Sequence, residues 1–234
     1  MSKRNIMVLA IMFLMVSTTG FAADKYQWKL VQTEDGCQTY TSVVSGRDYV
    51  AAKTVCTIPA RIEVLGTILR DIENYPDWME DCKDTKVLKV VDEKNDVIIF
   101  WFRQHITLLT DRDMVLKSKT INDKKSGRIL IYADSTNEVS YDTGKGYVRM
   151  PSFNSLFTLE WVDREKTRVT FMIDPDLGKG VPSGIANSTI TKTPLKSLKK
   201  MAAVAKKSKY VESAKTNKYG AMAEETARIK AGGK

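Results

Sequence analysis

Three short stretches in a fixed order decide the fold of this chain: DRDMV at residues 111–115, GYVR at residues 146–149, and DPDLGKGVPSGIAN at residues 174–187. The first opens a predicted strand, the second follows a loop, and the third precedes a long predicted helix. None of them carries catalytic chemistry. Their strand-opening and turn-forming residues are suited to shaping a curved sheet and placing a helix over it. This order points to a protein that encloses a ligand rather than to an enzyme.

The N-terminal segment has the layout of a secretory signal peptide. A basic pair at residues 3–4 precedes an apolar run over residues 6–16, and the small residues Gly20 and Ala22 follow at cleavage spacing. The run is shorter than the roughly 20 apolar residues of a membrane-spanning helix. We therefore expect residues 1–22 to be removed and the mature protein to be periplasmic or secreted. An uncleaved N-terminal anchor is the alternative.

The sequence holds three cysteines, an odd number for an oxidising compartment. Cys37 and Cys56 lie symmetrically about the dipeptide Gly46-Arg47. If this dipeptide forms a hairpin turn, the two cysteines face each other across neighbouring strands, and a disulfide fits between them. Cys82 is then left over. The alternative is that all three are small buried apolar residues.

The formal net charge of +9 is distributed unevenly along the chain. Residues 192–234 carry 12 basic and 3 acidic side chains, which leaves residues 23–191 close to neutral. A basic helix beside a neutral body suggests transient contact with an anionic membrane surface, and a solvated helix face is the alternative. The lysines concerned are Lys192, Lys196, Lys199, Lys200, Lys206 and Lys207. No nucleic-acid recognition motif is present, so we expect no nucleic-acid partner. We also expect the protein to be a monomer.

Hydrophobic periodicity predicts one α+β domain over residues 23–207, followed by a basic C-terminal tail over residues 208–234. We expect one helix from Pro59 to Asn74, a second from residue 184 to about residue 207, and a tail that is a loosely docked helix or disordered. The predicted strands are 28–30, 37–44, 49–58, 87–91, 97–106, 115–121, 128–135, 147–150, 154–162 and 167–174. A sheet of this many strands curls, so the fold class is a curved antiparallel sheet wrapped around the long C-terminal helix.

The three opening stretches resemble the START family of lipid-transfer domains, which adopt the helix-grip fold. The resemblance covers roughly residues 26–205 and includes Trp28-Lys29-Leu30, Gly36, Tyr40 and Trp78. With its predicted signal peptide, the chain resembles an exported bacterial member of that family. It implies an apolar cavity between the sheet and the C-terminal helix, which acts as a lid. The ligand implied is one sterol, phospholipid or fatty-acyl lipid. Burial of its chain in the cavity contributes about 0.8 kcal/mol per CH₂ to binding, so no cofactor is needed to hold it.

Seven residues are predicted to contact this ligand. The strand with three successive aromatic residues is apolar on both faces, so that one face can line the cavity and the other can pack elsewhere. An ordinary two-sided core is the alternative for this strand. The predicted contact residues are Phe100, Trp101, Phe102, Arg112, Arg149, Ile185 and Met201.

Two of these residues, Arg112 and Arg149, stand at family-pattern positions. The resemblance implies that a charged group at the inner end of the cavity pairs with an acid or meets the polar head of the ligand. Residues 102–104 offer no acid where relatives often carry one, which leaves Arg112 to Asp111, to Asp113 or to an anionic ligand. A buried guanidinium needs such a partner. The alternative is a pairing of Arg112 and Asp113 at the protein surface, which would contribute little.

A cyclase- or hydrolase-type enzyme of the same helix-grip superfamily is the alternative function. The sequence is unfavourable to it, because His105 is the only histidine and any Ser-His-Asp arrangement would have to use it. There is no His/Cys cluster for zinc and no glycine-rich phosphate loop. We therefore expect no catalytic residue, no metal and no cofactor, with His105 in a structural role.

Overall fold

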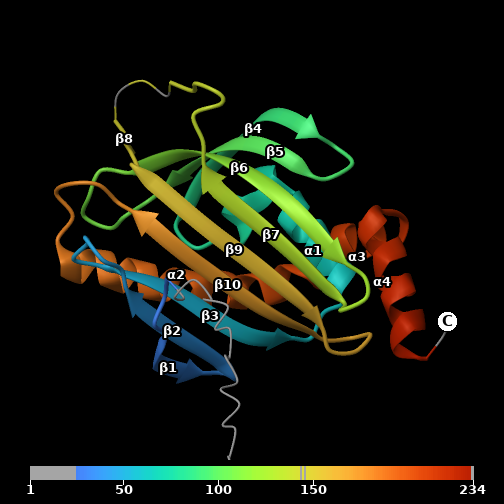
Figure 1. Ribbon diagram of the computed structural model, residues 1–234. Coiled ribbons are helices and arrows are strands. Elements are labelled where there is room, and N and C mark those ends of the chain that lie inside the picture. The colour runs from blue at the N-terminus through green and yellow to red at the C-terminus, as the bar shows by residue number, and fades with distance from the viewer. Residues whose placement is uncertain (1–24, 143, 145, 233–234) are drawn as a thin grey trace, which may run out of the picture.

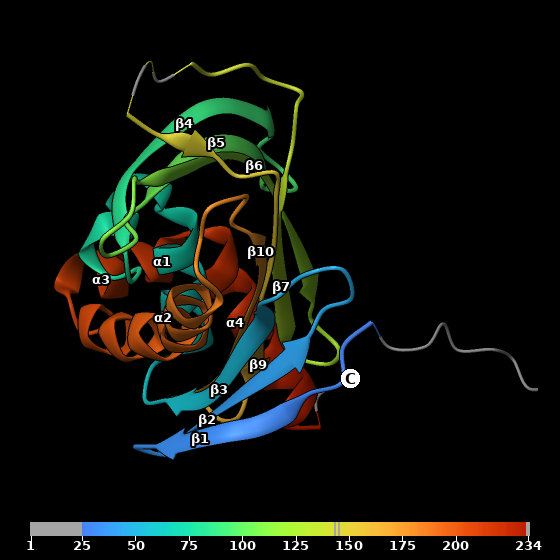
Figure 2. The same ribbon diagram turned by 90° about the vertical axis from the view of Figure 1, so that its left-hand side faces the viewer.

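The structure is a computed structural model that describes residues 25–142, 144 and 146–232. Among these residues, ten strands form one sheet that curves around a long C-terminal helix (Figure 1; Figure 2). The strand order is β1-β2-β3-β10-β9-β7-β6-β5-β4, and the short β8 pairs with β6 off this path. The predicted helix-grip architecture is thereby confirmed. The predicted signal peptide lies outside the described residues.

All neighbouring strands run antiparallel except β6 and β8, which are parallel. Alternating side chains separate a concave face, which holds the core, from a convex outer face. The strands are β1 (Lys29–Glu34), β2 (Cys37–Val43), β3 (Val50–Ile58), β4 (Cys82–Asp92), β5 (Val97–Gln104), β6 (Arg112–Asp123), β7 (Arg128–Ser135), β8 (Val148–Arg149), β9 (Ser152–Trp161) and β10 (Thr167–Asp176).

The hairpin of β2 and β3 is closed by a disulfide. Cys37 and Cys56 are bonded and lie on neighbouring strands, while Cys82 is a buried free thiol. Gly46 lies in the connecting turn with φ of +80°, a conformation that residues with a Cβ rarely adopt. Of the two interpretations of the cysteines, the structure therefore supports the disulfide.

The segment predicted as one helix over Pro59–Asn74 forms two elements. These are the α-helix α1 (Ile62–Arg70) and the 3₁₀-helix η1 (Ile72–Asp77). Asp71 separates them with ψ of 65°, outside the helical region, while its backbone N–H still caps the end of α1. Pro76 lies inside η1, where a short 3₁₀ turn has no long hydrogen-bonded ladder to break.

The long helix α2 (Ser183–Val204) lies in the curve of the sheet, as Figure 2 shows. Its sheet-facing side buries Ala186, Ile190, Leu198 and Met201. The side-chain carbonyl of Asn187 accepts a hydrogen bond of 3.0 Å from the backbone N–H of Val50, which joins the start of the helix to β3. No helix among the described residues is long and apolar enough to cross a membrane.

The segment predicted as a loosely docked or disordered tail forms α3 (Ser208–Thr216) and α4 (Lys218–Lys230), both packed on α1. The ring of Tyr219 lies against Gly66, where an added Cβ would come within 3.1 Å of it. The hydroxyl of Tyr219 donates to the carboxylate of Asp96 at 2.6 Å. Both residues are 2% exposed, so the two helices form a third layer of the fold.

Candidate functional site

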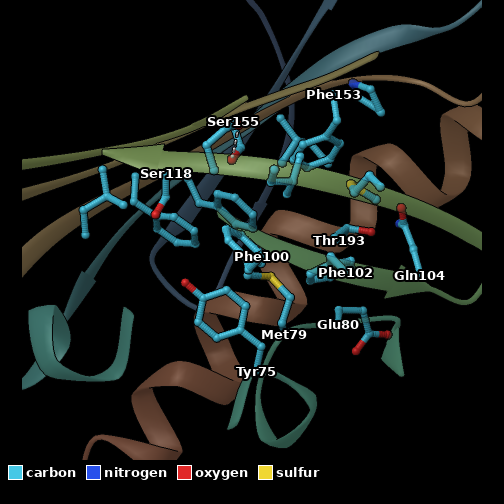
Figure 3. A pocket seen from close by; sticks show the side chains of 18 of the residues that line it. Tyr75, Met79, Glu80, Phe100, Phe102, Gln104, Ser118, Phe153, Ser155 and Thr193 are labelled. Carbon is cyan, nitrogen blue, oxygen red and sulfur yellow. Dashed lines mark hydrogen bonds between the residues drawn. The ribbon is translucent and has the colours of Figure 1, made fainter. Parts of the chain in front are cut away.

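An internal cavity lies between the concave face of the sheet, α2 and the segment around η1 (Figure 3). The sheet supplies most of its wall, through β5, β6, β7, β9 and β10. Inward-facing residues recur at every second position of these strands, which is why a continuous apolar surface forms. The apolar wall residues include Phe100, Phe102, Met114, Leu116, Ile131, Ala133, Phe153, Phe157, Phe171, Ile173, Leu177 and Ile190.

The cavity is narrow in this conformation. The centre of a water molecule can occupy about 50 Å³ of it, and about 10–15 Å³ of such space holds one water. The rings of Phe157 and Phe171 stack across neighbouring strands with centroids 3.9 Å apart. A lipid can therefore enter only when α2, η1 or these side chains move apart.

Polar groups lie at separate places in this apolar wall. Ser118 and Ser155 flank Ala133 on the three neighbouring strands β6, β7 and β9. Gln104, Thr193 and Glu80 line another part of the wall, away from the two serines in Figure 3. Such an arrangement suits a mainly apolar ligand with a few polar atoms.

Two of the seven predicted contact residues, Phe100 and Phe102, line the cavity from β5. A third, Arg112, is not among the residues that line the cavity, but it begins β6 and pairs across the strands with Gln104, which does line it. Directly paired residues of antiparallel strands share a face of the sheet, so Arg112 lies on the cavity face. It is 4% exposed. A contact between these residues and a ligand stays a prediction.

Trp101 lies on the opposite face of β5 and does not line the cavity. Together with Ile99 and Val115 it forms a separate apolar cluster on the outer face, covered by Val139 and Tyr141. This placement does not support the predicted ligand contact of Trp101. The physical reason is the two-residue period of the strand, which gives neighbours opposite directions.

Arg149 also lies on the outer face, where it binds Asp113 through two hydrogen bonds of 2.9 and 2.7 Å. The carboxylate of Asp113 also accepts a hydrogen bond of 2.9 Å from the indole of Trp101. These contacts join β8 to β6. This placement does not support the predicted role of Arg149 at the ligand head; its contacts connect the first two opening stretches.

The last two predicted residues lie on α2 but not in the cavity wall. Ile185 is half-buried and borders a separate surface groove together with Leu108 and Lys192. Met201 is fully buried and packs in the core beyond the cavity. Ile190 and Thr193 are the residues through which α2 reaches the cavity.

Ion pairs hold α2 against the rest of the domain. The carboxylate of Glu80 accepts from Lys196 at 2.8 Å and lies 2.5 Å from Lys200. The backbone N–H of Glu80 donates to the hydroxyl of Ser197 at 3.0 Å. Lys199 of α2 also pairs with Asp35 at 2.7 Å, and Lys207, three residues after the end of α2, pairs with Asp77 at 3.0 Å.

The single histidine lies outside the cavity wall. Nδ1 of His105 is 2.8 Å from a carboxylate oxygen of Asp111, which also accepts from Arg103. Among the described residues, no cluster of His, Cys, Asp and Glu is arranged to hold a metal ion.

Several wall residues were absent from the sequence-based set. Met114, Leu116 and Ser118 alternate with outward residues along β6, and this period would have identified them. Tyr75 and Met79 follow α1, and no periodic signal predicts that this segment turns back to the cavity.

A model of the START domain matches residues 11–210. The chain belongs to the START domain family. The uncharacterized protein PA1579 of Pseudomonas aeruginosa is 29% identical over 203 residues, which cover 86% of this chain and 96% of that protein. The family match ends within α3, so most of the α3–α4 layer lies beyond it.

Two solved START structures share the fold. The STAR-related lipid transfer protein of Xanthomonas axonopodis is 23% identical, covers 77% of this chain and 99% of its own, and superposes with a TM-score of 0.68. Human STARD10 is 17% identical, covers 80% of this chain and 76% of its own, and has a TM-score of 0.69. At these identities the likeness establishes the helix-grip fold.

Proposed function

We propose that this START protein is a carrier that binds one hydrophobic ligand, such as a sterol, a phospholipid or a fatty-acyl lipid, and conveys or presents it in the periplasm. The observation that carries the proposal is the apolar cavity enclosed between the concave sheet and α2. Burial of a lipid chain there removes apolar surface from water at about 0.8 kcal/mol per CH₂. A carrier of this kind needs no catalytic group, and it acts as a monomer.

One feature of the sequence and one of the structure support export. Residues 1–22 have the layout of a signal peptide. The disulfide between Cys37 and Cys56 is of a kind that persists in oxidising compartments and is rare in the cytosol.

Membrane contact is proposed to open the cavity. Lys196 and Lys200 are about half exposed, and both are held by Glu80 at the cavity wall. An anionic lipid surface offers these lysines alternative partners, at about 1 kcal/mol per basic residue near the surface. The transfer of the two lysines from Glu80 to lipid head groups would release α2, which acts as the lid.

The enzyme alternative has no supporting observation. It depended on His105, whose ring nitrogen lies 2.8 Å from Asp111 at a place outside the cavity wall. We therefore propose no reaction for the cavity.

Lipid transfer between vesicles tests the proposal. Donor vesicles carry an NBD-labelled fatty acid or an NBD-labelled phosphatidylcholine, and acceptors are phosphatidylcholine with or without phosphatidylglycerol. We expect the protein to accelerate transfer of at least one probe, and to do so faster with anionic acceptors. A double variant Lys196→Gln/Lys200→Gln should lose the preference for anionic vesicles. Transfer of both probes at the protein-free rate would contradict the proposal.

A further inference from the structure

A second hollow of the molecule lies where α1, α3, α4 and the turn between β4 and β5 meet (Figure 1). We call it the polar groove. It shares no wall residue with the lipid cavity, and the centre of a water molecule can occupy about 480 Å³ of it. Most of the α3–α4 layer, which supplies one of its sides, lies beyond the family match. Lipid carriage therefore does not account for this groove.

The wall of the polar groove contains a hydroxyl group without a hydrogen-bond partner. Tyr210 lines the groove and is 2% exposed, and its hydroxyl is buried and makes no hydrogen bond with any described residue. Burial raises the pKa of this hydroxyl, which keeps it protonated, and the charges of Lys209 and Asp71 in the same groove also act on it. The ammonium of Lys209 lies 4.6 Å from the centre of the Tyr210 ring. An acceptor bound there would remove the cost of the unpaired donor.

Three cationic side chains surround the groove and retain unused donors. Arg70 donates from Nε to Asp96 at 2.8 Å, while its two terminal nitrogens make no hydrogen bond within the described ranges. Lys209 is 3.4 Å from Asp71, and Lys218 lies 2.6 Å from Asp96. The three cationic side chains are 31%, 47% and 39% exposed, in that order, so a solute can reach them.

The acids of the groove are mostly engaged. Asp96 is 2% exposed and accepts from the hydroxyl of Tyr219 at 2.6 Å, in addition to its contacts with two of the cations. Asp71 accepts from the side-chain amide of Asn74 at 2.8 Å. Glu93 is exposed in the turn between β4 and β5 and acts only on the rim. The donors next to Tyr210 thus outnumber the free acceptors.

We propose that the polar groove binds a phosphate group, which Arg70 and Lys209 contact from two helices while the hydroxyl of Tyr210 donates to it. Guanidinium and ammonium groups bind phosphate oxygens through charge-assisted hydrogen bonds. Arg70 ends α1 and Lys209 lies near the start of α3. A bound phosphate therefore joins the α3–α4 layer to the core of the domain, a role separate from lipid carriage.

Titration calorimetry with inorganic phosphate and with glycerol 3-phosphate tests the proposal, at an ionic strength held constant with sodium chloride. We expect saturable binding of one anion per chain and a melting temperature that rises with its concentration. Lys209→Gln and Tyr210→Phe should each weaken binding about tenfold, because hydrogen bonds to charged groups are the strong ones. Tyr210→Phe should leave the stability of the phosphate-free protein unchanged, since its hydroxyl has no partner to lose.

Two further variants separate a specific site from the general positive charge of the protein. Lys215→Gln makes the same charge change on the exposed side of α3, outside the groove, and should leave the affinity unchanged. Glu93→Gln removes the acid at the rim and should strengthen binding. Equal losses in Lys209→Gln and Lys215→Gln, with no loss in Tyr210→Phe, would overturn the proposal.

Phosphatidylcholine vesicles with and without phosphatidic acid distinguish a free phosphate from a lipid head group. Saturable binding of the two soluble probes, weakened by Tyr210→Phe, assigns the groove to free phosphate compounds. Binding to the phosphatidic acid vesicles alone, weakened by the same variant, assigns it to a lipid head group. If no probe binds in a way that depends on Tyr210, the proposal is wrong, and the lipid cavity is unaffected by that result.

Discussion

Arg149 binds Asp113 through two hydrogen bonds on the convex side of the sheet, away from the cavity. Asp113 comes from the first opening stretch of the sequence and Arg149 from the second. Their contact shows that these stretches have a structural role. The carboxylate of Asp113, whose side chain is 2% exposed, accepts hydrogen bonds from both Arg149 and the indole of Trp101. The cavity face is left to the residues that alternate with them.

Replacement of Asp113 should destabilise the domain. The variant Asp113→Ala leaves the buried indole N–H of Trp101 without its acceptor and releases Arg149, which we expect to cost about 2–3 kcal/mol. Urea unfolding measures this loss. The exposed pair of Arg128 and Glu160 provides a control, because Arg128→Ala should cost less than about 1 kcal/mol. Equal effects of the two variants on the free energy of unfolding would show that the contacts of Asp113 do not contribute specially to stability.

The disulfide should stabilise the protein measurably. Cys37 and Cys56 are 19 residues apart in the sequence, and the double variant Cys37→Ala/Cys56→Ala should lose about 3 kcal/mol of unfolding free energy. In the native protein, a thiol reagent should label none of the three cysteines, because Cys82 is buried and its pKa is raised by that burial. Rapid labelling of two cysteines without reductant would contradict the bond.

The contact between Glu80 and α2 should weaken in acid. Burial acts to raise the pKa of Glu80, but the hydrogen bonds of Lys196 and Lys200 outweigh it and lower the pKa. The stabilisation is therefore complete above the unfolded pKa of about 4.3 and is lost as the pH falls through the lower folded value. Exchange of the uncharged probe Nile red should accelerate about two- to fivefold at acidic pH.

The variant Glu80→Gln tests the same contact at neutral pH. It should give the fast exchange at every pH, because its side chain carries no charge for the two lysines. The matched control is Glu138→Gln, which removes an exposed pair with Lys117 of 2.6 Å on the outer side. Identical exchange rates for Glu80→Gln and the control would show that the ion pairs of Glu80 do not hold α2 over the cavity.

The α3–α4 layer should contribute to the stability of the whole domain. Tyr219→Ala removes a buried ring that packs on Gly66 and a hydrogen bond to Asp96, and it should cost about 3–5 kcal/mol. Lys215→Ala, on the exposed side of α3, should change stability by less than about 0.5 kcal/mol. A Tyr219→Ala protein as stable as the control would show that the layer is dispensable.

The architecture was predictable from the sequence because its signals are local and repeated. Strand periodicity, the turn at Gly46 and the order of the three stretches define a curved sheet followed by a helix. The α3–α4 layer was missed because the segment has few large apolar residues. Its close packing depends on glycines: a Cβ on Gly220 would approach the carbonyl of Ala214 to 2.3 Å.

The site was predictable only in part, because its residues meet across the fold. The two-residue period predicts that Phe100 and Trp101 face opposite sides, but which side is hollow depends on the direction in which the sheet curves. The partner of Arg149 lies 36 positions away in the sequence, at Asp113. Without that pairing, the sequence alone could not separate Arg112, which faces inward, from Arg149, which faces outward.

Native mass spectrometry tests the central claim, that the enclosed cavity binds a lipid, most directly. The protein is mixed with extracted bacterial lipids and compared with Ala133→Phe, which fills the cavity from β7, and with Tyr132→Phe, which changes the neighbouring residue on the other face. We predict one bound lipid per chain for the unaltered protein and for Tyr132→Phe, and a strongly reduced bound fraction for a folded Ala133→Phe. Absence of any bound lipid, or equal binding by all three proteins, would contradict the account.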